Sequence, residues 1–517
     1  MNTNKKEEKN VCDEKMSFEE CELAILRVAM DKAEEKQGRK VVNSPEIRKI
    51  IGILEKFIRK KKLVVYGGTA VNNILPKKDQ FYNKDIALSD YDFFSVNALD
   101  DAKELSDIYV KEGFPEVEAK AGQHYGTYKV FVDFVGIADI TYIHKEIYKE
   151  LVSDAIKVDG ILYAPANFLR MSMYLELSRP DGDISRWDKI LKRITLLNKH
   201  YPLKGDHCSK IEFQRGLEDV TSLEKENEKE TGKETSKKTS SKSEATALLK
   251  KNKSKEAIIF DTLRNTFINQ SVVFFGGYSL SLYSHYMPED LQHKLKKVAD
   301  FDVLAEDPEF VANIVKERLE DEGFSNVSIV KRDEIGEIVA PHYQIMIKKD
   351  TVAFIYKPIA CHSYNMVKIH GEKVKIATID TILSFYLAFL YSGRNYYDID
   401  RILCMAQYLF DVQQKNRLIQ KGLLKRFSIQ CYGKQDTLET MRAEKAEKFK
   451  ELKDKKNSEE YNKWFLRYRP LEEKEDRAKA RNSKKTKKTK GKKGKKRKTR
   501  KQNNFWQKFP IPIPIAL

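Results

Sequence analysis

Apolar residues recur at helical or strand spacing through two long stretches of the chain, residues 21–215 and 256–432. In the first stretch, Ser44-Pro45 is a favourable start for a helix, and the isoleucines, leucine and phenylalanine that follow fall on one helical face. Asp159-Gly160 lies between two short β-rich runs and predicts a hairpin turn. Further helices are predicted over 69–75, 100–112, 166–178 and 186–201, and strands over 63–66, 91–96, 127–135 and 137–143. This alternation predicts an α+β fold, with a mixed sheet and a helical annex.

The second stretch repeats the landmarks of the first. The corresponding residues, separated by 209 to 215 positions, are Gly67-Gly68 and Gly276-Gly277, Asp90 and Asp300, Asp92 and Asp302, Gly113 and Gly323, Tyr128 and Tyr343, and Leu191 and Leu403. So small a drift predicts the internal duplication of a whole domain. Two unrelated α/β domains that share glycine turns are the alternative.

Composition changes sharply outside the two stretches. Residues 219–255 lose nearly all aromatic, valine and isoleucine side chains, so they cannot bury enough apolar surface to offset the entropy of ordering. We therefore predict a disordered linker there, between a first domain at 21–215 and a second at 256–432. The other predicted segments are a flexible N-terminus at 1–20, a charged helical segment at 433–480 and a basic disordered tail at 481–517.

The formal charge of +19 comes mostly from the tail. Residues 481–501 hold 14 lysines and arginines and no acidic residue, so the rest of the chain is only mildly basic. A dense run of cations binds polyanions by releasing their counterions, which predicts an RNA contact whose affinity falls steeply with salt. A solubilising or nuclear-localisation-like tail is the other interpretation.

The six cysteines form no C-x-x-C pair and no metal-binding spacing with histidine. In a chain of 517 residues this pattern predicts free, mostly buried thiols in a reducing compartment. The polar N-terminal residues contain no secretory signal. The most apolar long stretch, residues 378–391, is shorter than the roughly 20 residues that a membrane span needs. We expect a soluble intracellular protein with no membrane partner.

Candidate chemistry lies in VVYGGTAVNNIL, which begins at Val64, and in SDYDFFSV shortly after it. Gly67-Gly68 permits a sharp turn after a strand, and the helix that follows offers free N–H groups to a phosphate. Asp90 and Asp92 are two positions apart on a predicted strand, so their carboxylates lie on one face. Mg²⁺ neutralises such a pair and keeps positions for substrate phosphates. A plain turn and an exposed acidic strand end are the alternatives.

A third acid would complete a two-metal site, and two residues compete for that position. Asp139 is flanked by apolar residues, where a carboxylate is costly unless it is paired or metal-bound. In the duplication it corresponds to Phe354, inside a predicted strand, whereas Asp133 corresponds to Lys348, a residue type that water accommodates. We therefore choose Asp139.

The order G-G-[ST], D-x-D and an isolated, apolar-flanked D resembles the DNA polymerase β-like nucleotidyltransferase superfamily. The strings at 66–75, 89–95, 129–143 and 169–202 resemble, more specifically, the poly(A) polymerase catalytic subunits of large nucleocytoplasmic DNA viruses: poxviruses, African swine fever virus and mimivirus-like viruses. The resemblance is strong over about residues 45–205 and architectural over 256–430. It implies a duplicated nucleotidyltransferase domain with helical annexes and a degenerate second copy.

The resemblance implies a template-independent polynucleotide adenylyltransferase that adds poly(A) to the 3′ end of viral mRNA. ATP would be the substrate, and two Mg²⁺ or Mn²⁺ ions would be the cofactors. Asp90 and Asp92 would bind both ions, while Asp139 would bind the catalytic ion and help to deprotonate the RNA 3′-hydroxyl. The residues assigned to nucleotide binding are Gly67, Gly68 and Thr69. The triphosphate contact stays open among Lys129, Arg170 and Arg179.

The second copy keeps Gly276-Gly277 and both acids of its D-x-D motif, but Phe354 stands where the third acid would be. A missing carboxylate removes a metal ligand, so we predict a catalytically inactive copy, kept as a wall of the cleft or as a dimer surface. Its acids, Asp300 and Asp302, would bind a cation or basic residues, or simply end a strand.

Two other functions are considered. A terminal transferase for a different nucleotide fits because the base-reading residues are not legible, and a non-catalytic RNA-binding or assembly subunit is disfavoured by the three acids of the first copy. The resemblance also implies the RNA 3′ end as a partner, and a homodimer or a cap-methylating processivity subunit. It places the protein in the virion and the host cytoplasm, at the viral factory.

Overall fold

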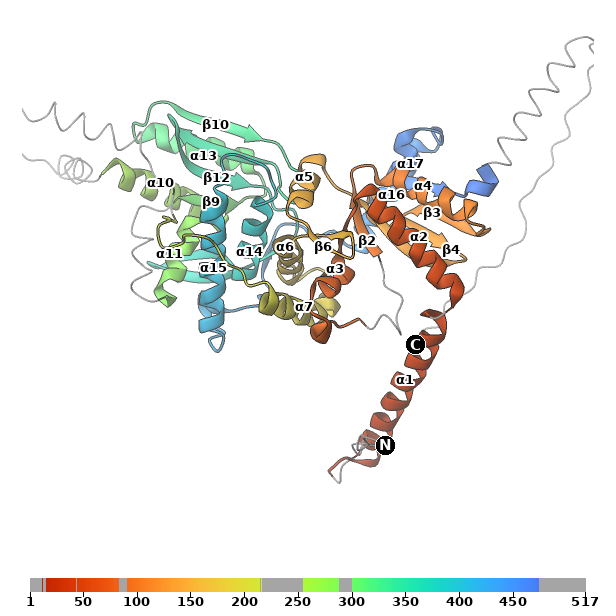
Figure 1. The fold of residues 1–517 in the computed structure, drawn as a ribbon. Coiled ribbons are helices and arrows are strands. Elements are labelled where there is room, and N and C mark those ends of the chain that lie inside the picture. The colour runs from red at the N-terminus through yellow and green to blue at the C-terminus, as the bar shows by residue number, and fades with distance from the viewer. Residues whose placement is uncertain are drawn as a thin grey trace, which may run out of the picture. The chain divides into compact units, whose positions relative to one another are not determined.

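The computed structural model describes residues 12, 15–42, 44–82, 91–213, 215, 254–287 and 300–473. Residues 1–468 group into one compact unit, and residues 469–517 form a second. The first unit contains two mixed sheets with helices packed on them (Figure 1). Asp90, the predicted linker up to residue 253 and the predicted basic tail lie outside the described residues.

The first sheet has the strand order β16-β3-β4-β5-β2-β1-β7-β6. Its strands are β1 (Val64–Tyr66), β2 (Tyr91–Ser95), β3 (Val117–Ala121), β4 (Thr127–Val132), β5 (Val135–Tyr142), β6 (Ile156–Val158), β7 (Ile161–Tyr163) and β16 (Arg467–Tyr468). The helices of this part are α1 (Phe18–Val42), α2 (Pro45–Lys61), α3 (Gly67–Ile74), α4 (Ala98–Lys111), α5 (Lys145–Ser153), α6 (Ala166–Leu177) and α7 (Trp187–His200). α2 begins where the sequence predicts, because the Ser44 hydroxyl accepts a hydrogen bond from the Ile47 amide at 3.2 Å.

The second sheet has the order β10-β11-β12-β9-β8-β14-β13-β15. Its strands are β8 (Val273–Phe274), β9 (Phe301–Leu304), β10 (Val327–Arg332), β11 (His342–Ile347), β12 (Asp350–Tyr356), β13 (His362–Ile369), β14 (Glu372–Ala377) and β15 (Cys431–Tyr432). The later helices are α10 (Lys255–Asn269), α11 (Gly277–Tyr283), α13 (Pro308–Asp321), α14 (Ile379–Phe389), α15 (Ile399–Lys415), α16 (Leu438–Leu452) and α17 (Glu459–Phe465).

The two sheets repeat one topology. The order β3-β4-β5-β2-β1-β7-β6 corresponds strand for strand to β10-β11-β12-β9-β8-β14-β13. The register agrees as well, because Asp92 pairs with Asp139 between β2 and β5, and Asp302 pairs with Phe354 between β9 and β12. The predicted α+β class and the predicted duplication are therefore confirmed.

The two copies contact each other through helices that follow the sheets. α6 of the first copy packs against α14 of the second, and the ring centroids of Phe168 and Tyr391 lie 5.2 Å apart. An ion pair of 2.9 Å joins Glu146 of α5 to Arg394, which follows α14. No helix within the described ranges is long and apolar enough to cross a membrane.

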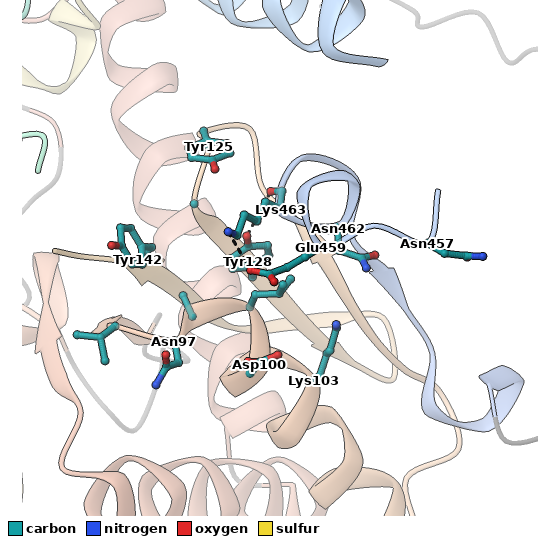
Figure 2. A pocket seen from close by; sticks show the side chains of 14 residues that line it. Asn97, Asp100, Lys103, Tyr125, Tyr128, Tyr142, Asn457, Glu459, Asn462 and Lys463 are labelled. Carbon is teal, nitrogen blue, oxygen red and sulfur yellow. Dashed lines mark hydrogen bonds and ion pairs between the residues drawn. The ribbon is translucent and has the colours of Figure 1, made fainter. Parts of the chain in front are cut away.

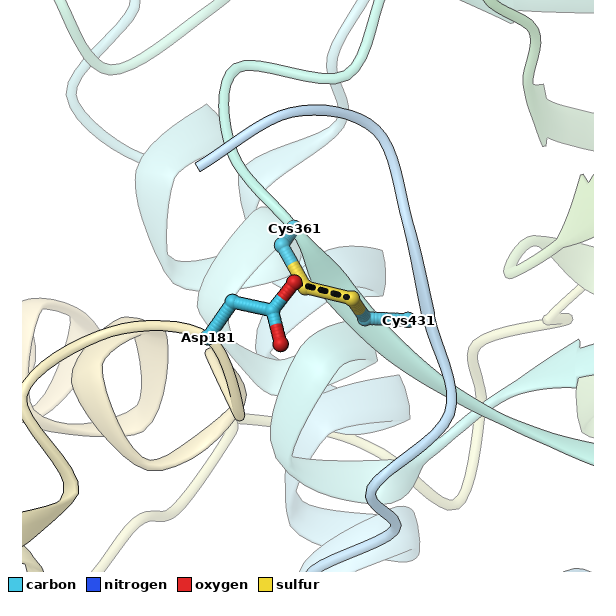
Figure 3. Close-up of side chains that lie close together, drawn as sticks. All are labelled: Asp181, Cys361 and Cys431. Carbon is cyan, nitrogen blue, oxygen red and sulfur yellow. Dashed lines mark hydrogen bonds between the residues drawn. A yellow bond between two sulfur atoms is a disulfide. The ribbon is translucent and has the colours of Figure 1, made fainter. Parts of the chain in front are cut away.

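The prediction of free thiols was wrong. The disulfides are Cys12–Cys21, Cys208–Cys404 and Cys361–Cys431, with Cα separations of 5.2, 5.3 and 5.2 Å. The last pair lies beside the carboxylate of Asp181, whose Oδ2 is 3.4 Å from the Cys431 sulfur (Figure 3). These partners are 9 to 196 residues apart, so the search for short C-x-x-C spacings could not detect them.

Candidate active site

The glycine turn brings the backbone into contact with a carboxylate. β1 ends at Tyr66 and α3 begins directly at Gly67, two residues earlier than predicted. Gly67 has φ +70°, and a Cβ placed there would lie 2.7 Å from Oδ2 of Asp92. Both the positive φ and this close approach require glycine. The turn therefore sets the N-terminus of α3 against the D-x-D strand.

The sheet register places two of the predicted acids side by side. Asp92 is the register partner of Tyr66 on β1 and of Asp139 on β5. Register partners on neighbouring strands point to the same face of a sheet, so all three side chains share one face. Asp133 lies instead in the β4–β5 turn with φ +48°. The geometry thus brings Asp139, not Asp133, to Asp92, while the third predicted acid, Asp90, lies outside the described residues.

Lys129 is the cationic partner of Asp139. The two residues are register partners on β4 and β5, and the Lys129 ammonium forms an ion pair and hydrogen bond with Oδ2 of Asp139. Both side chains keep access to water, with exposed fractions of 41% and 31%. The Lys129 ammonium therefore supplies a positive charge to the Asp139 carboxylate, as a bound metal ion would.

Tyr66 lies next to Asp92 on the same face of the sheet. Its ring stacks on Phe94 at a centroid distance of 3.9 Å, and its hydroxyl and the Thr141 hydroxyl are hydrogen-bonded at 2.9 Å. Burial, and then the charge of Asp92, raise the pKa of Tyr66 well above its usual value. The phenol therefore stays protonated and keeps its hydrogen at neutral pH.

Arg193 of α7 was missed by the sequence analysis and lies at the other glycine of the turn. A Cβ on Gly68 would lie 2.9 Å from Nη2 of Arg193 and 2.6 Å from the hydroxyl of Tyr82. The guanidinium donates a hydrogen bond to that hydroxyl and lies 5.0 Å from the ring centroid of Phe81. Arg193 is only 8% exposed, yet it forms no ion pair with a carboxylate of the described residues.

Among the described residues no carboxylate forms an ion pair with this buried guanidinium, and its position next to a helix N-terminus and a glycine backbone favours an anion at the turn. Thr69 lies in the first turn of α3 and is buried. The residues assigned from sequence to nucleotide binding, Gly67, Gly68 and Thr69, therefore line the same turn. The sequence pattern does not single out Arg193. The residue lies on α7, which begins more than 110 residues after the turn, so only the fold brings it there.

Two of the basic residues considered from sequence, Arg170 and Lys129, have other partners. Arg170 is fully buried and donates a hydrogen bond from Nε to Asn198 at 2.7 Å, with further bonds to Asn167 and the Tyr201 carbonyl. It therefore ties α6 to α7. Arg179 follows α6 and is half-buried; burial lowers its pKa, and the charge of Glu176 opposes this shift. Lys129 pairs with Asp139, as described above.

A separate cavity of about 600 Å³ lies just beyond the C-terminal ends of β2 and β5 (Figure 2). Tyr125, Tyr128 and Tyr142 line one side, and α17 lines the other with Glu459 and Lys463. The Tyr128 hydroxyl donates a hydrogen bond to the Lys463 carbonyl at 3.2 Å, which fixes α17 against the sheet. The predicted charged segment, residues 433–480, thus supplies one wall of this cavity.

Residues 52–183 match the family model of the poly(A) polymerase catalytic subunit. That segment contains the glycine turn, the D-x-D motif and Asp139, so the resemblance inferred from sequence is confirmed there.

Relatives named poly(A) polymerase catalytic subunit come from two kinds of virus. The relative from Acanthamoeba polyphaga mimivirus is 31% identical over 181 residues, which cover 34% of this chain and 30% of the relative. One from African swine fever virus is 31% identical over 171 residues, covering 32% of this chain and 36% of the relative. The chain therefore matches about a third of the length of these curated relatives.

The likeness of the fold extends much further than the likeness of the sequence. The crystal structure of the Megavirus polyadenylate synthase aligns with a TM-score of 0.67 and 19% identity, covering 94% of this chain and 92% of that chain. The chain therefore shares its fold with that crystal structure.

The acid pair has the donor atoms that divalent ions prefer. Asp92 and Asp139 offer hard oxygen ligands on one face, beside a turn that favours phosphate, and no cysteine or histidine is among these in-register residues. Mg²⁺ and Mn²⁺ prefer this type of donor. The residues present therefore fit the ions, and their role as ligands stays a prediction.

Proposed function

We propose that the chain is a polynucleotide adenylyltransferase that extends the 3′ end of RNA with AMP from ATP. The observation that carries the proposal is the register pairing of Asp92 with Asp139 next to the Gly67 turn. It lies inside the segment that matches the poly(A) polymerase family. An in-line transfer to RNA needs an anion seat and a carboxylate cluster next to each other, and the first copy supplies both.

The chain's own residues have distinct parts in this proposal. The N-terminus of α3 and the Arg193 guanidinium bind the triphosphate of ATP and orient its α-phosphate. Asp90, Asp92 and Asp139 would hold two Mg²⁺ or Mn²⁺ ions, which supply charge neutralisation at the phosphates when bound. Asp139 accepts the proton of the RNA 3′-hydroxyl once Lys129 moves aside. The oxygen then forms a bond to the α-phosphorus, and pyrophosphate leaves.

RNA is proposed to lie along the tyrosine-lined cavity. Tyr125 and Tyr142 are about half exposed, and the Tyr125 ring lies 4.5 Å from that of Trp464. Aromatic faces of this kind stack on the bases of single strands without strong sequence preference. The basic residues of the tail would add a salt-dependent contact to the same strand.

The resemblance extends the proposal to assembly and location. A homodimer, or a complex with a cap-methylating processivity subunit, would act on viral mRNA in the virion and the host cytoplasm. Light scattering of the full chain, alone and with such a subunit, separates the two assemblies by mass.

The function is tested by primer extension with each of the four nucleoside triphosphates and Mg²⁺ or Mn²⁺. Extension with ATP alone supports a poly(A) polymerase. Extension with another nucleotide supports a different terminal transferase, and no extension with any nucleotide or metal supports a non-catalytic RNA-binding subunit. Asp92→Ala should abolish extension and leave RNA binding measurable.

A further inference from the structure

The acid pair of the second copy has a cationic partner from outside its own sheet. The Arg215 side chain approaches both carboxylates: Nε lies 2.7 Å from Oδ2 of Asp300, and Nη2 donates a hydrogen bond to Oδ1 of Asp302 at 3.0 Å. Its guanidinium carbon lies 4.9 Å from the ring centroid of Phe354. Phe354 is the register partner of Asp302. The guanidinium therefore lies over the position that corresponds to Asp139 in the first copy.

Burial makes this contact strong. The side chains of Arg215, Asp300 and Asp302 are 14%, 8% and 12% exposed. Burial disfavours the charge of Arg215, but the two carboxylates outweigh burial and raise the pKa of Arg215 further. Two acids on one face need a positive charge when water is excluded, and Arg215 provides it.

The glycine turn of the second copy leaves no space for a nucleotide. A Cβ placed on Gly276 would collide with the Asp302 carboxylate, and one on Gly277 would collide with the Asp300 carboxylate. The void bounded by Arg215 and these acids is about 20 Å³. That volume suffices for about one water molecule. Both acids of this copy therefore lie against the turn, and Asp300 faces Gly277 where Arg193 faces the corresponding Gly68 of the first copy.

The segment that carries Arg215 is itself fastened to the second copy. It follows α7 and runs along α15, where the Gly205 amide donates a hydrogen bond to the Gln407 side chain at 3.0 Å. Cys208 and Cys404 are disulfide-bonded. The ring of Phe213 lies 5.4 Å from that of Tyr408. These contacts hold residues 203–213 against the second copy, so that the guanidinium of the nearby Arg215 reaches the acids.

We propose that Arg215 is an internal cation that occupies the acid pair of the second copy in place of a divalent ion, and so fastens residues 203–215 to the second sheet. The second copy then takes up neither metal nor nucleotide through Asp300 and Asp302. The inference concerns the second copy alone and does not depend on which nucleotide the first copy transfers.

The proposal makes a specific demand on coupled substitutions. Arg215→Met leaves two adjacent buried carboxylates without their ion-pair partner, with only the more distant charge of Arg401, among the described residues, acting on Asp302. Asp300→Asn with Asp302→Asn leaves the guanidinium without its acids. Each change removes one side of the ion pair and is costly, whereas removing both sides leaves neither group buried without its partner. The combined variant should therefore be more stable than either partial variant predicts.

The test is a thermodynamic cycle on the full chain, read as melting temperature with R215M, D300N/D302N and the combined variant. Each partial variant should melt more than about 5 °C below the parent, and the combined variant should recover at least half of the loss. Losses that simply add would overturn the proposal, because Arg215 would then act by packing alone. The exposed pair Arg318 and Asp321, 3.8 Å apart, is the matched control, and R318M with D321N should change little.

If R215M does not fold, the folding and solubility of the combined variant test the proposal. The combined variant should then fold and be soluble, and its failure to fold while R215K folds would overturn the proposal. Primer extension per folded molecule should be the same in the parent and the combined variant, since the first copy is untouched. A loss of extension with intact recovery of stability bears on the proposed function and not on Arg215.

Discussion

Arg193 is a buried cation beside the second glycine of the turn. It is buried against Phe81 and Tyr82, and it approaches Gly68 without an ion-pair partner among the described side chains. The desolvated charge is a cost to folding unless an anion arrives. The residue is therefore best explained as part of the triphosphate seat.

Replacing Arg193 should weaken ATP binding. Arg193→Met removes charged hydrogen bonds worth roughly 1.5–3 kcal/mol each, so KM for ATP should rise at least about tenfold. Lys192→Met is the matched control, because Lys192 is the next residue on α7 and is 73% exposed. Steady-state primer extension measures both variants. An unchanged KM in Arg193→Met would contradict the assignment.

Gly67 tests the contact between turn and carboxylate. Gly67→Ala should strain the backbone by about 1–3 kcal/mol and push the Asp92 carboxylate away, so kcat should fall more than about tenfold. Gly113→Ala is the control: Gly113 also has positive φ, but nothing lies within 4 Å of its added Cβ. It should lower the free energy of unfolding comparably while leaving kcat unchanged. Equal losses of kcat in the two variants would rule out the contact as the cause.

At the scale of elements, strands and helices with local signals were predictable. Residues 156–163 form the predicted hairpin, with φ +50° at Asp159 and +79° at Gly160. The helix after Ser44 and the strands that carry the candidate acids also lie close to their predicted bounds. β16 was missed because two residues of a charged segment join β3 only through tertiary contacts, such as the 3.0 Å ion pair of Arg467 with Glu118.

Of the candidate site, too, only a part could be predicted from the sequence. The pairing of Asp92 with Asp139 could be anticipated, because both lie on apolar strands and the duplication marks their positions. Arg193 and Arg215 could not, because each reaches its site from a segment that is distant in sequence and has no distinctive pattern of its own. The cysteine pairs escaped prediction for the same reason.

The strands and α17 around the tyrosine-lined cavity give a prediction about RNA. Tyr142→Ala at the end of β5 should weaken binding of single-stranded RNA about fivefold or more, since one base stack is worth roughly 1–3 kcal/mol. Phe134→Ala removes an aromatic ring of the β4–β5 turn that is 82% exposed and lies outside the cavity, and should not change the affinity. Fluorescence anisotropy at constant salt measures both. Equal affinities for the two variants would exclude the cavity as an RNA contact.

Strand β11 carries a buried histidine that should make stability depend on pH. The His342 ring nitrogens contact the Ala340 carbonyl at 2.9 Å and the Tyr396 hydroxyl at 3.1 Å, and burial lowers the pKa of His342 to about 4. The unfolded chain binds this proton near pH 6.5, so the stabilisation is complete above that pH and is lost as pH falls towards 4.

Urea unfolding at pH 7 and pH 5 tests this dependence. His342 should account for about 2 kcal/mol of the stability lost between the two pH values. His342→Gln should therefore lose less stability on acidification than the parent, although it is less stable at pH 7. His370→Gln, at an exposed position after β13, should keep the parent's dependence. An identical pH dependence in His342→Gln and the parent would contradict the assignment.

At the scale of the whole molecule, the two copies of the fold surround their acid pairs differently. The first copy sets carboxylates beside a turn that a buried arginine prepares for an anion. In the second copy, the corresponding acids are taken by an arginine from the segment after α7, and a phenylalanine replaces the third acid. This difference between the acid pairs explains why the proposed chemistry is confined to one of two sheets with the same strand order.

Asp139 is proposed to act with Asp92 in the first copy, and single-turnover primer extension with Asp139→Asn is the sharpest test of this pairing. We expect the rate to fall at least about a thousandfold with ATP binding retained, while Asp133→Asn, in the exposed β4–β5 turn, keeps the parent rate. A near-parent rate in Asp139→Asn, or a comparable loss in Asp133→Asn, would contradict it.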